Sequence, residues 1–270
     1  MLTIYAPLDN HKSKCWEIFN GIKSSWPEKV DIKDNRDMLL PSSNSMFWGF
    51  VNNNLNFVQH IERNNLHYWF TDTPYFGRFD NRDLRIDNHY WRICKNGIHA
   101  QFVENCPSDR FETFKMNLKP LRQHGEHILV CPSSAQINLY LKQPSWLAQT
   151  LDELKKYTDR PVKVRLKPRK NGTSGPAVAD VPIEQDLQQA WACVTSCSIS
   201  AIESVLSGVP VFSHKKSFAA AVANFNLSDI EKPKWKDPSQ WLHSLCYQQF
   251  TPEEFANGTA VDILKGIGHL

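Results

Sequence analysis

The chain has 270 residues, of which 41% are hydrophobic, 22% charged and 11% aromatic, and its formal net charge is +3. This composition is that of a globular protein and excludes a disordered chain, while the length allows one large domain or two modest ones. No stretch approaches about 18 consecutive apolar residues, which excludes a membrane-spanning helix. The amino terminus does not have the pattern of a signal peptide, so we expect a cytoplasmic protein, of an infected or lysogenic bacterial host if the phage-type resemblance described below holds.

Apolar runs that end in turn residues predict strands, and apolar residues at helical spacing predict helices between several of them. The predicted strands are 2–7, 45–51, 67–72, 89–94, 127–132, 162–167, 191–196 and 209–213. The predicted helices are 53–64, 145–157, 184–190, 199–207, 217–224, 238–249 and 252–265.

Strands that alternate with helices at this spacing predict an α/β fold with parallel sheets. The best break in the pattern lies near residues 118–126, where Pro, Gly and charged residues follow one another. We therefore expect two Rossmann-like halves facing a cleft, with domains at 1–124 and 125–270. The last two helices are expected to brace the first half.

The cysteine and histidine patterns do not predict a metal site or a disulfide framework. The seven cysteines are odd in number and contain no CxxC pair, so we expect small buried side chains. The ten histidines form no HExxH motif. We expect neither a metal nor another bound cofactor.

A serine-rich turn, Thr195–Ser198, follows the predicted strand 191–196 and precedes a helix that Gly208 ends. A turn of this kind offers free backbone N–H groups at the carboxyl edge of a parallel sheet, which suits a phosphate or diphosphate. An ordinary helix cap by Ser198 or Ser200 is the alternative. The predicted phosphate-binding residues here are Ser196, Ser198, Ser200 and Glu203.

A basic segment, KVRLKPRK at 163–170, forms the predicted strand before that turn. Strand alternation puts Lys163, Arg165, Lys167 and Arg169 on one face. In a central strand these residues would project from its carboxyl end and could hold an anion, and we expect Arg165, Lys167 and Arg169 to meet the serine turn in one pocket. An exposed edge strand with solvated charges is the alternative.

The most site-like segment of the first half is FTDTPYFGR, residues 70–78. Asp72 ends a predicted strand, so it could act as a general base for an acceptor hydroxyl, or it could form an Asx-turn. Basic and aromatic residues that suit phosphate contacts and base stacking follow it. They are Tyr75, Arg78, Arg82, Arg85, Trp91 and Arg92. Because aspartates alternate with the arginines, a self-paired surface loop is the alternative.

The segments LKPRK (166–170) and SCSISAIESVLSGVPVF (196–212) resemble the donor half of GT-B glycosyltransferases, in particular the capsule-polysaccharide and sialyl-type branch. The resemblance covers about 100 residues. It implies a nucleotide-sugar donor as co-substrate and no requirement for a bound metal. Where that branch has a His after the Pro, this chain has Arg169.

Over a greater length the chain resembles phage and prophage proteins of similar size, a group without an established activity. The resembling segments are YWFTDTPYFGR (68–78), YWRICKNG (90–97), SDRF (108–111), HGEHILVCPSS (124–134), TDRPVKVRLKP (158–168) and WLHSLCYQQFTPEEFANG (241–258).

Together these observations lead to one main hypothesis, a nucleotide-sugar-dependent glycosyltransferase that modifies a hydroxymethylated pyrimidine in double-stranded DNA. Enzymes that act on a base extrude it from the duplex, which the aromatic and basic residues after Asp72 would assist. The alternatives are a glycosyltransferase that acts on a host surface or capsule glycan, and a non-catalytic module that binds phosphate or nucleic acid. The mild net charge does not require nucleic acid.

Overall fold

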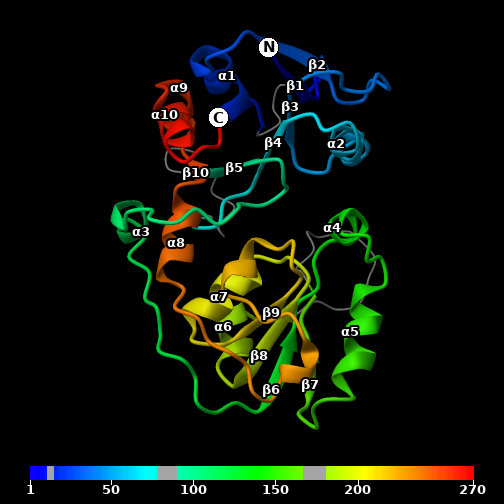
Figure 1. Cartoon of the computed structure of the whole chain (residues 1–270), viewed down its shortest axis with the longest axis vertical. Coiled ribbons are helices and arrows are strands. Elements are labelled where there is room, and N and C mark those ends of the chain that lie inside the picture. Colours follow the sequence, from blue (N-terminus) through cyan, green and yellow to red (C-terminus); the bar gives the residue numbers. More distant parts are fainter. Residues whose placement is uncertain (11–14, 78–89, 167–180) are drawn as a thin grey trace. The chain divides into compact units, whose positions relative to one another are not determined.

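The computed structural model describes residues 1–10, 15–77, 90–166 and 181–270, which form two compact units (Figure 1). Unit 1 contains Met1–Phe114 and Gln240–Leu270, and unit 2 contains Lys115–Ser239. The predicted α/β class with two largely parallel sheets is confirmed. The domain boundary at 124/125 and the cleft between the halves stay predictions.

Unit 1 is built on a six-stranded sheet in the order β10-β5-β4-β3-β1-β2. The strands are β1 (Leu2–Ala6), β2 (Val30–Asp34), β3 (Ser45–Trp48), β4 (Tyr68–Asp72), β5 (Trp91–Lys95) and β10 (Gln249–Phe250). The first four are parallel, whereas β5 is antiparallel to both β4 and β10. Strand β2 was not predicted, because as an edge strand it carries charged residues between only two apolar ones.

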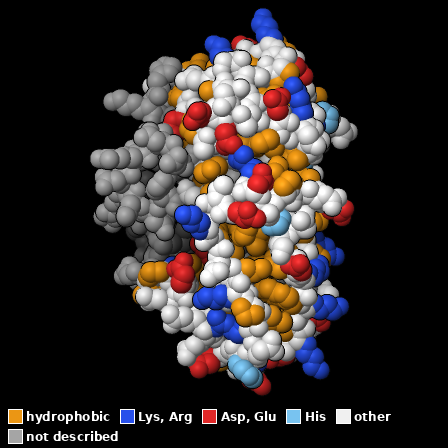
Figure 2. Space-filling model, turned by 90° about the vertical axis from the view of Figure 1, so that its left-hand side faces the viewer, with side chains coloured by type: hydrophobic (Ala, Val, Ile, Leu, Met, Phe, Trp, Pro, Cys, Tyr) orange, Lys and Arg blue, Asp and Glu red, His pale blue; other side chains and the backbone are white. Residues whose placement is uncertain are grey.

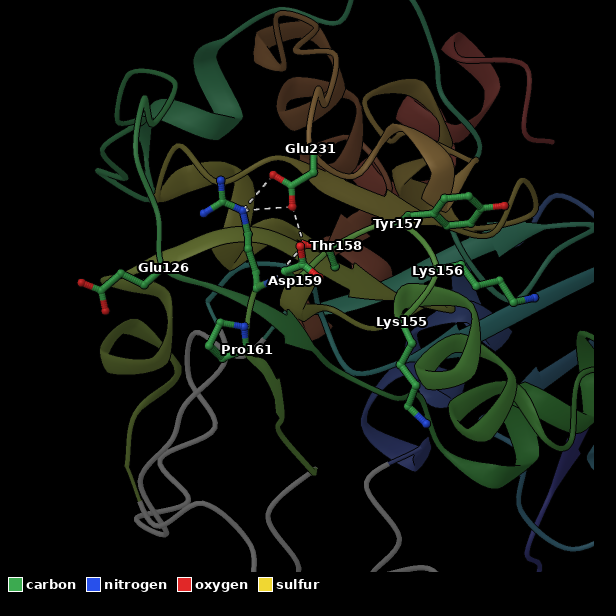
Figure 3. A pocket seen from close by; sticks show the side chains of 9 residues that line it. Glu126, Lys155, Lys156, Tyr157, Thr158, Asp159, Pro161 and Glu231 are labelled. Atoms are coloured by element: carbon green, nitrogen blue, oxygen red, sulfur yellow. Dashed lines mark hydrogen bonds and ion pairs between the residues drawn. The ribbon is translucent and has the colours of Figure 1, made fainter.

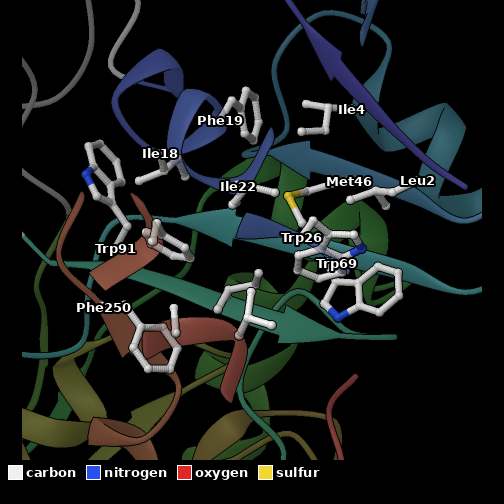
Figure 4. Close-up of a cluster of buried hydrophobic side chains, with 14 of the residues drawn as sticks. Leu2, Ile4, Ile18, Phe19, Ile22, Trp26, Met46, Trp69, Trp91 and Phe250 are labelled. Atoms are coloured by element: carbon white, nitrogen blue, oxygen red, sulfur yellow. The ribbon is translucent and has the colours of Figure 1, made fainter. Parts of the chain in front are cut away.

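The helices of unit 1 are α1 (Cys15–Ser25), α2 (Asn54–Arg63), α3 (Asp109–Glu112), α9 (Pro252–Ala256) and α10 (Thr259–Gly266), together with α8 (Ser239–Cys246), which begins at the last residue of unit 2. Figure 4 shows Ile18, Phe19 and Ile22 of α1 in a buried cluster with Leu2 and Ile4 of β1. Helices α9 and α10 add to the same cluster. Helix α1 approaches α9 so closely that a Cβ on Gly21 would meet the backbone nitrogen of Ala256 at 2.9 Å.

Unit 2 contains a parallel four-stranded sheet in the order β7-β6-β8-β9. Its strands are β6 (His127–Val130), β7 (Val162–Val164), β8 (Ala190–Thr195) and β9 (Val211–Ser213), and its helices are α4 (Ala135–Tyr140), α5 (Trp146–Leu154), α6 (Ile183–Leu187) and α7 (Ser200–Leu206), with the 3₁₀ turns η2 (Phe218–Ala221) and η3 (Leu227–Asp229). Both faces of the central strands are buried, with Ile128 and Val130 in one cluster and Leu129 and Cys193 in another. This two-sided burial is why β6 and β8 are continuous apolar runs.

The strand order of unit 2 creates a point at which the chain reverses direction across the sheet. From β6 the chain passes to β7 on one side, and from β7 it returns to β8 on the other side of β6. Ligands of open α/β sheets bind outside the carboxyl ends of the strands at such a switch point. The loops after β6 and β8 therefore form the candidate site of unit 2.

Candidate functional site

The serine turn lies at the carboxyl end of β8, on the switch point of unit 2. Two contacts join it to the segment after β6. The Cys197 N–H donates to Ser133 Oγ at 2.9 Å, and Ser196 Oγ donates to Asn138 Oδ1 of α4 at 2.8 Å. The loops at the switch point are thus fixed to each other by hydrogen bonds that leave little freedom to the turn.

A second set of contacts reaches the same turn from β9. Ser213 Oγ and the His214 N–H both donate to the Ser196 carbonyl, each at 3.3 Å. His214 Nδ1 accepts the N–H of Lys216 at 3.0 Å, so the proton of a neutral imidazole lies on Nε2. Burial and the charge of Lys216 lower the pKa of His214, which favours this neutral form.

The serines of the turn differ in exposure and in hydrogen-bond partners. Ser196 is fully buried and engaged with Asn138, and Ser200 is also buried. Ser198 is partly exposed, and its hydroxyl accepts the N–H of Ser200 at 3.3 Å. Helix α7 begins at Ser200 with Ile199 at its N-cap, so Ser198 lies one position before the N-cap, although its hydroxyl accepts the N–H of the first helical residue. Glu203 lies in the first turn of α7.

The basic segment before the turn is an edge strand, and its charges are engaged locally. Arg165 and Lys163 both pair with the carboxylate of Asp186, which is 1% exposed, and Arg165 also donates to the Val181 carbonyl at 2.8 Å. Burial acts to raise the pKa of Asp186, but the two cations outweigh it and lower that pKa.

The ion pair of Arg165 with Asp186 concerns the prediction that the basic strand and the serine turn share one pocket. Within residues 90–166 and 181–270, no hydrogen bond or ion pair joins Arg165 to Ser196 or Ser198. The guanidinium of Arg165 instead pairs with the buried carboxylate of Asp186, and a shared pocket of Arg165 with Ser196 and Ser198 stays a prediction. Lys167 and Arg169 lie outside the described residues.

The predicted base of unit 1, Asp72, ends β4 and is engaged on both carboxylate oxygens. Its Oδ2 lies 3.0 Å from Arg92 Nη2, and its Oδ1 accepts the N–H of Thr73 at 2.7 Å. The second contact is the turn that the alternative interpretation predicted. With 30% of its side chain exposed, Asp72 remains accessible to solvent.

The residues expected to contact an acceptor base are buried where the structure describes them. Tyr75, Trp91 and Arg92 are 4%, 1% and 2% exposed. The Tyr75 hydroxyl accepts the Ala100 N–H at 2.7 Å, and the Arg92 guanidinium lies 5.4 Å from the Tyr75 ring. Burial leaves these rings no face on which a base could stack, which corrects the prediction for Tyr75 and Trp91. Arg78, Arg82 and Arg85 lie outside the described residues.

A hollow of about 580 Å³ lies at the opposite, amino-terminal edge of the unit 2 sheet (Figure 3). Glu126 before β6 and Pro161 before β7 line it. Arg160 at its wall pairs with Glu231 at 3.0 Å and lies 4.5 Å from the Trp191 ring. This arginine is engaged in packing the wall, and the hollow lies at the wrong end of the strands for a switch-point ligand.

Three further features concern the surface charge, metal ligands and membrane-spanning helices. Acidic and basic side chains are interspersed over the coloured part of the face in Figure 2. Within the described ranges, no group of three or more His, Cys, Asp or Glu residues is arranged to hold a metal ion, and no helix is long and apolar enough to cross a membrane.

No family model and no curated protein matches the chain. Two solved structures from Thermosulfurimonas dismutans are similar to it. The KpsC β-Kdo 2,4-transferase has 10% sequence identity and a TM-score of 0.52, with 97% of each chain covered. The KpsC β-Kdo 2,7-transferase has 13% identity and a TM-score of 0.45, with 96% of this chain and 98% of the other covered. The first likeness shows a shared fold. The phage-type resemblance has no support in these matches.

Three residues that contact the serine turn were not predicted from the sequence, namely Ser133, Asn138 and His214. Each follows a strand directly or lies in the helix after it. The segments CPSS after β6 and SHKK after β9 carry the signal that could have found Ser133 and His214, because polar residues at the ends of adjacent parallel strands meet at one edge.

Proposed function

We propose that the chain is a glycosyltransferase that transfers a sugar from a nucleotide-sugar donor to a hydroxyl of a glycan. The observation that carries the proposal is the serine turn at the switch point, held by Ser133, Asn138 and Ser213. The fold likeness to a β-Kdo 2,4-transferase over 97% of both chains supports it.

The donor would lie at the carboxyl edge of the unit 2 sheet. Ser198, the Nε2–H of His214 and the ammonium groups of Lys215 and Lys216 would contact its phosphate, and Lys167 and Arg169 stay predicted contacts. Hydrogen-bond donors and cations at that position stabilise the negative charge that develops on the leaving phosphate. This chemistry does not require a metal, and metal independence is part of the proposal.

The transfer forms one bond and breaks one. The acceptor oxygen bonds to the anomeric carbon, the bond from that carbon to the phosphate oxygen breaks, and the acceptor proton passes to a base. Asp72 is the proposed base, because its carboxylate is partly exposed and Arg92 orients it.

We favour a glycan over a DNA base as the acceptor. The solved structure with the same fold is named a β-Kdo 2,4-transferase, and the capsule-type resemblance of the C-terminal half agrees with it. The aromatic residues that would stack on an extruded base, Tyr75 and Trp91, are buried. A host surface or capsule glycan is therefore the proposed acceptor class, and DNA is the competing one.

The test is a transfer assay with a panel of nucleotide sugars and two acceptors, bacterial surface glycans and hydroxymethylated duplex DNA, read by mass spectrometry. We expect a mass gain on a glycan, and a lower rate for Ser198→Ala than for Ser228→Ala, an exposed serine of the same unit. A mass gain on DNA alone would replace the glycan with DNA. No transfer and no donor hydrolysis with any nucleotide sugar would contradict the proposed function.

A further inference from the structure

An exposed aromatic ring beside β9 is flanked by two lysines. Phe225 is 42% exposed. The ammonium groups of Lys215 and Lys236 each lie 6.0 Å from the centre of its ring. We refer to these three residues as the Phe225 cluster.

The backbone around the Phe225 cluster is held in place by β9. Asn224 forms a parallel bridge with Phe212, and the Ser213 N–H donates to the Asn224 carbonyl at 3.0 Å. The segment therefore runs in the direction of β9, and Phe225 follows at the carboxyl edge, the edge of the sheet that also carries His214.

The side chain of Asn224 fixes the segment that brings Lys236. Its Nδ2 donates to the Lys234 carbonyl at 3.0 Å, and its Oδ1 accepts the Lys234 N–H at 2.9 Å. The Lys236 ammonium donates to the Ala221 carbonyl at 3.2 Å. Asn224 is 8% exposed, so its hydrogen bonds with Lys234 belong to the buried part of the fold rather than to the surface.

The lysines of the Phe225 cluster form no ion pair with the described carboxylates. Among the residues that the structure describes, no carboxylate forms an ion pair with Lys215 or Lys236. A bound anion would be attracted by both ammonium groups. Because Phe225 is 42% exposed, part of its ring is accessible to an aromatic group.

We propose that the Phe225 cluster binds the nucleotide of the donor, with the base stacked on Phe225 and the phosphate between Lys215 and Lys236. The proposal rests on the proposed function, because it takes the donor to be a nucleotide sugar. It extends that function by assigning recognition of the nucleotide base to the segment beside β9. The serine turn then lies near the bond between the sugar and the phosphate, which breaks in the transfer.

Isothermal titration with a panel of nucleoside monophosphates (AMP, CMP, GMP and UMP) and with ribose 5-phosphate tests the assignment. Phe225→Leu should weaken the nucleotide that binds best by about fivefold or more, since stacking on an aromatic side chain contributes that much. It should leave ribose 5-phosphate unchanged. Lys236→Gln should weaken both probes and reduce the salt dependence of binding.

Two matched variants serve as controls. Phe102→Leu removes a phenylalanine of similar exposure, 43%, in unit 1, and Lys232→Gln removes an exposed lysine of the same segment. Both should bind like the wild type. Thermal unfolding of all four variants checks that each is folded.

The outcomes separate the two proposals. A wild type that binds a nucleotide, with Phe225→Leu and Lys236→Gln binding it equally well, would overturn the Phe225 cluster and leave the proposed function intact. A wild type that binds none of the nucleotides and transfers no sugar would contradict the proposed function, and the inference would fall with it.

Discussion

Asp186→Asn should destabilise unit 2 without weakening donor binding. Asp186 is the shared partner of Lys163 and Arg165, whose side chains are 52% and 10% exposed. Removing one partner of a buried pair costs about 3–5 kcal/mol. Since Lys163 stays solvated and Asn keeps a hydrogen-bond acceptor, we expect the lower end, about 3 kcal/mol.

A loss of that size should lower the unfolding temperature of unit 2 by roughly 10 °C in calorimetry. The matched control is Asp152→Asn, which breaks an exposed pair with Lys155 and should cost about 0.5 kcal/mol or less. The pH dependence gives a second readout. Because the native pKa of Asp186 is lowered, its contribution is complete above the unfolded pKa near 3.9 and is lost as the pH falls through the native value. The difference between wild type and Asp186→Asn should therefore be constant above about pH 5 and shrink below pH 4.

Two results together would assign Arg165 to the donor phosphate instead. If Asp186→Asn is as stable as Asp152→Asn, and Arg165→Ala weakens donor binding tenfold or more, then Arg165 is a phosphate ligand, as the sequence suggested, rather than the partner of a buried carboxylate.

Three further predictions concern the site. Ser133→Ala removes the acceptor of the Cys197 N–H, so it should cost about 1–3 kcal/mol of stability and weaken donor binding in calorimetry; unchanged donor affinity would count against the turn. Asp72→Asn should lower kcat in a steady-state assay and leave the donor Kd unchanged; normal turnover would remove Asp72 from the mechanism. Because the pKa of His214 is lowered, the donor affinity of the wild type should stay constant in titrations from pH 8 to about 6.5. His214→Asn should weaken donor binding at pH 7. A rise of wild-type affinity as the pH falls over that range would contradict a neutral imidazole.

Sequence patterns predicted the parts of the fold in which the local residue pattern and the burial in the folded protein favour the same structure. Strands β6 and β8 are buried on both faces, so their apolar runs identify them. The capping box of Thr251 and Glu254 at the start of α9 follows from the T-x-x-E spacing, because both of its hydrogen bonds are local. Strand β10 was missed because two residues carry no detectable period.

The candidate site was only partly predictable, because its contacts join segments far apart in the chain. The serine turn was found from its position between a strand and a helix. The partners that hold it, Ser133 and Asn138, are about 60 residues earlier, and the sheet order that brings them together is a tertiary property. The pairing of Arg165 with Asp186 was not predicted for the same reason, since nothing local reveals it.

Amide chemical shifts in NMR can map where a nucleotide sugar binds to the wild-type protein. Saturating donor should shift the amides of Ser133, Cys197, Ser198 and His214, at the carboxyl edge of the unit 2 sheet. Shifts confined to the hollow around residues 155–161, at the other edge, or no shifts with any nucleotide sugar, would contradict the proposed donor site.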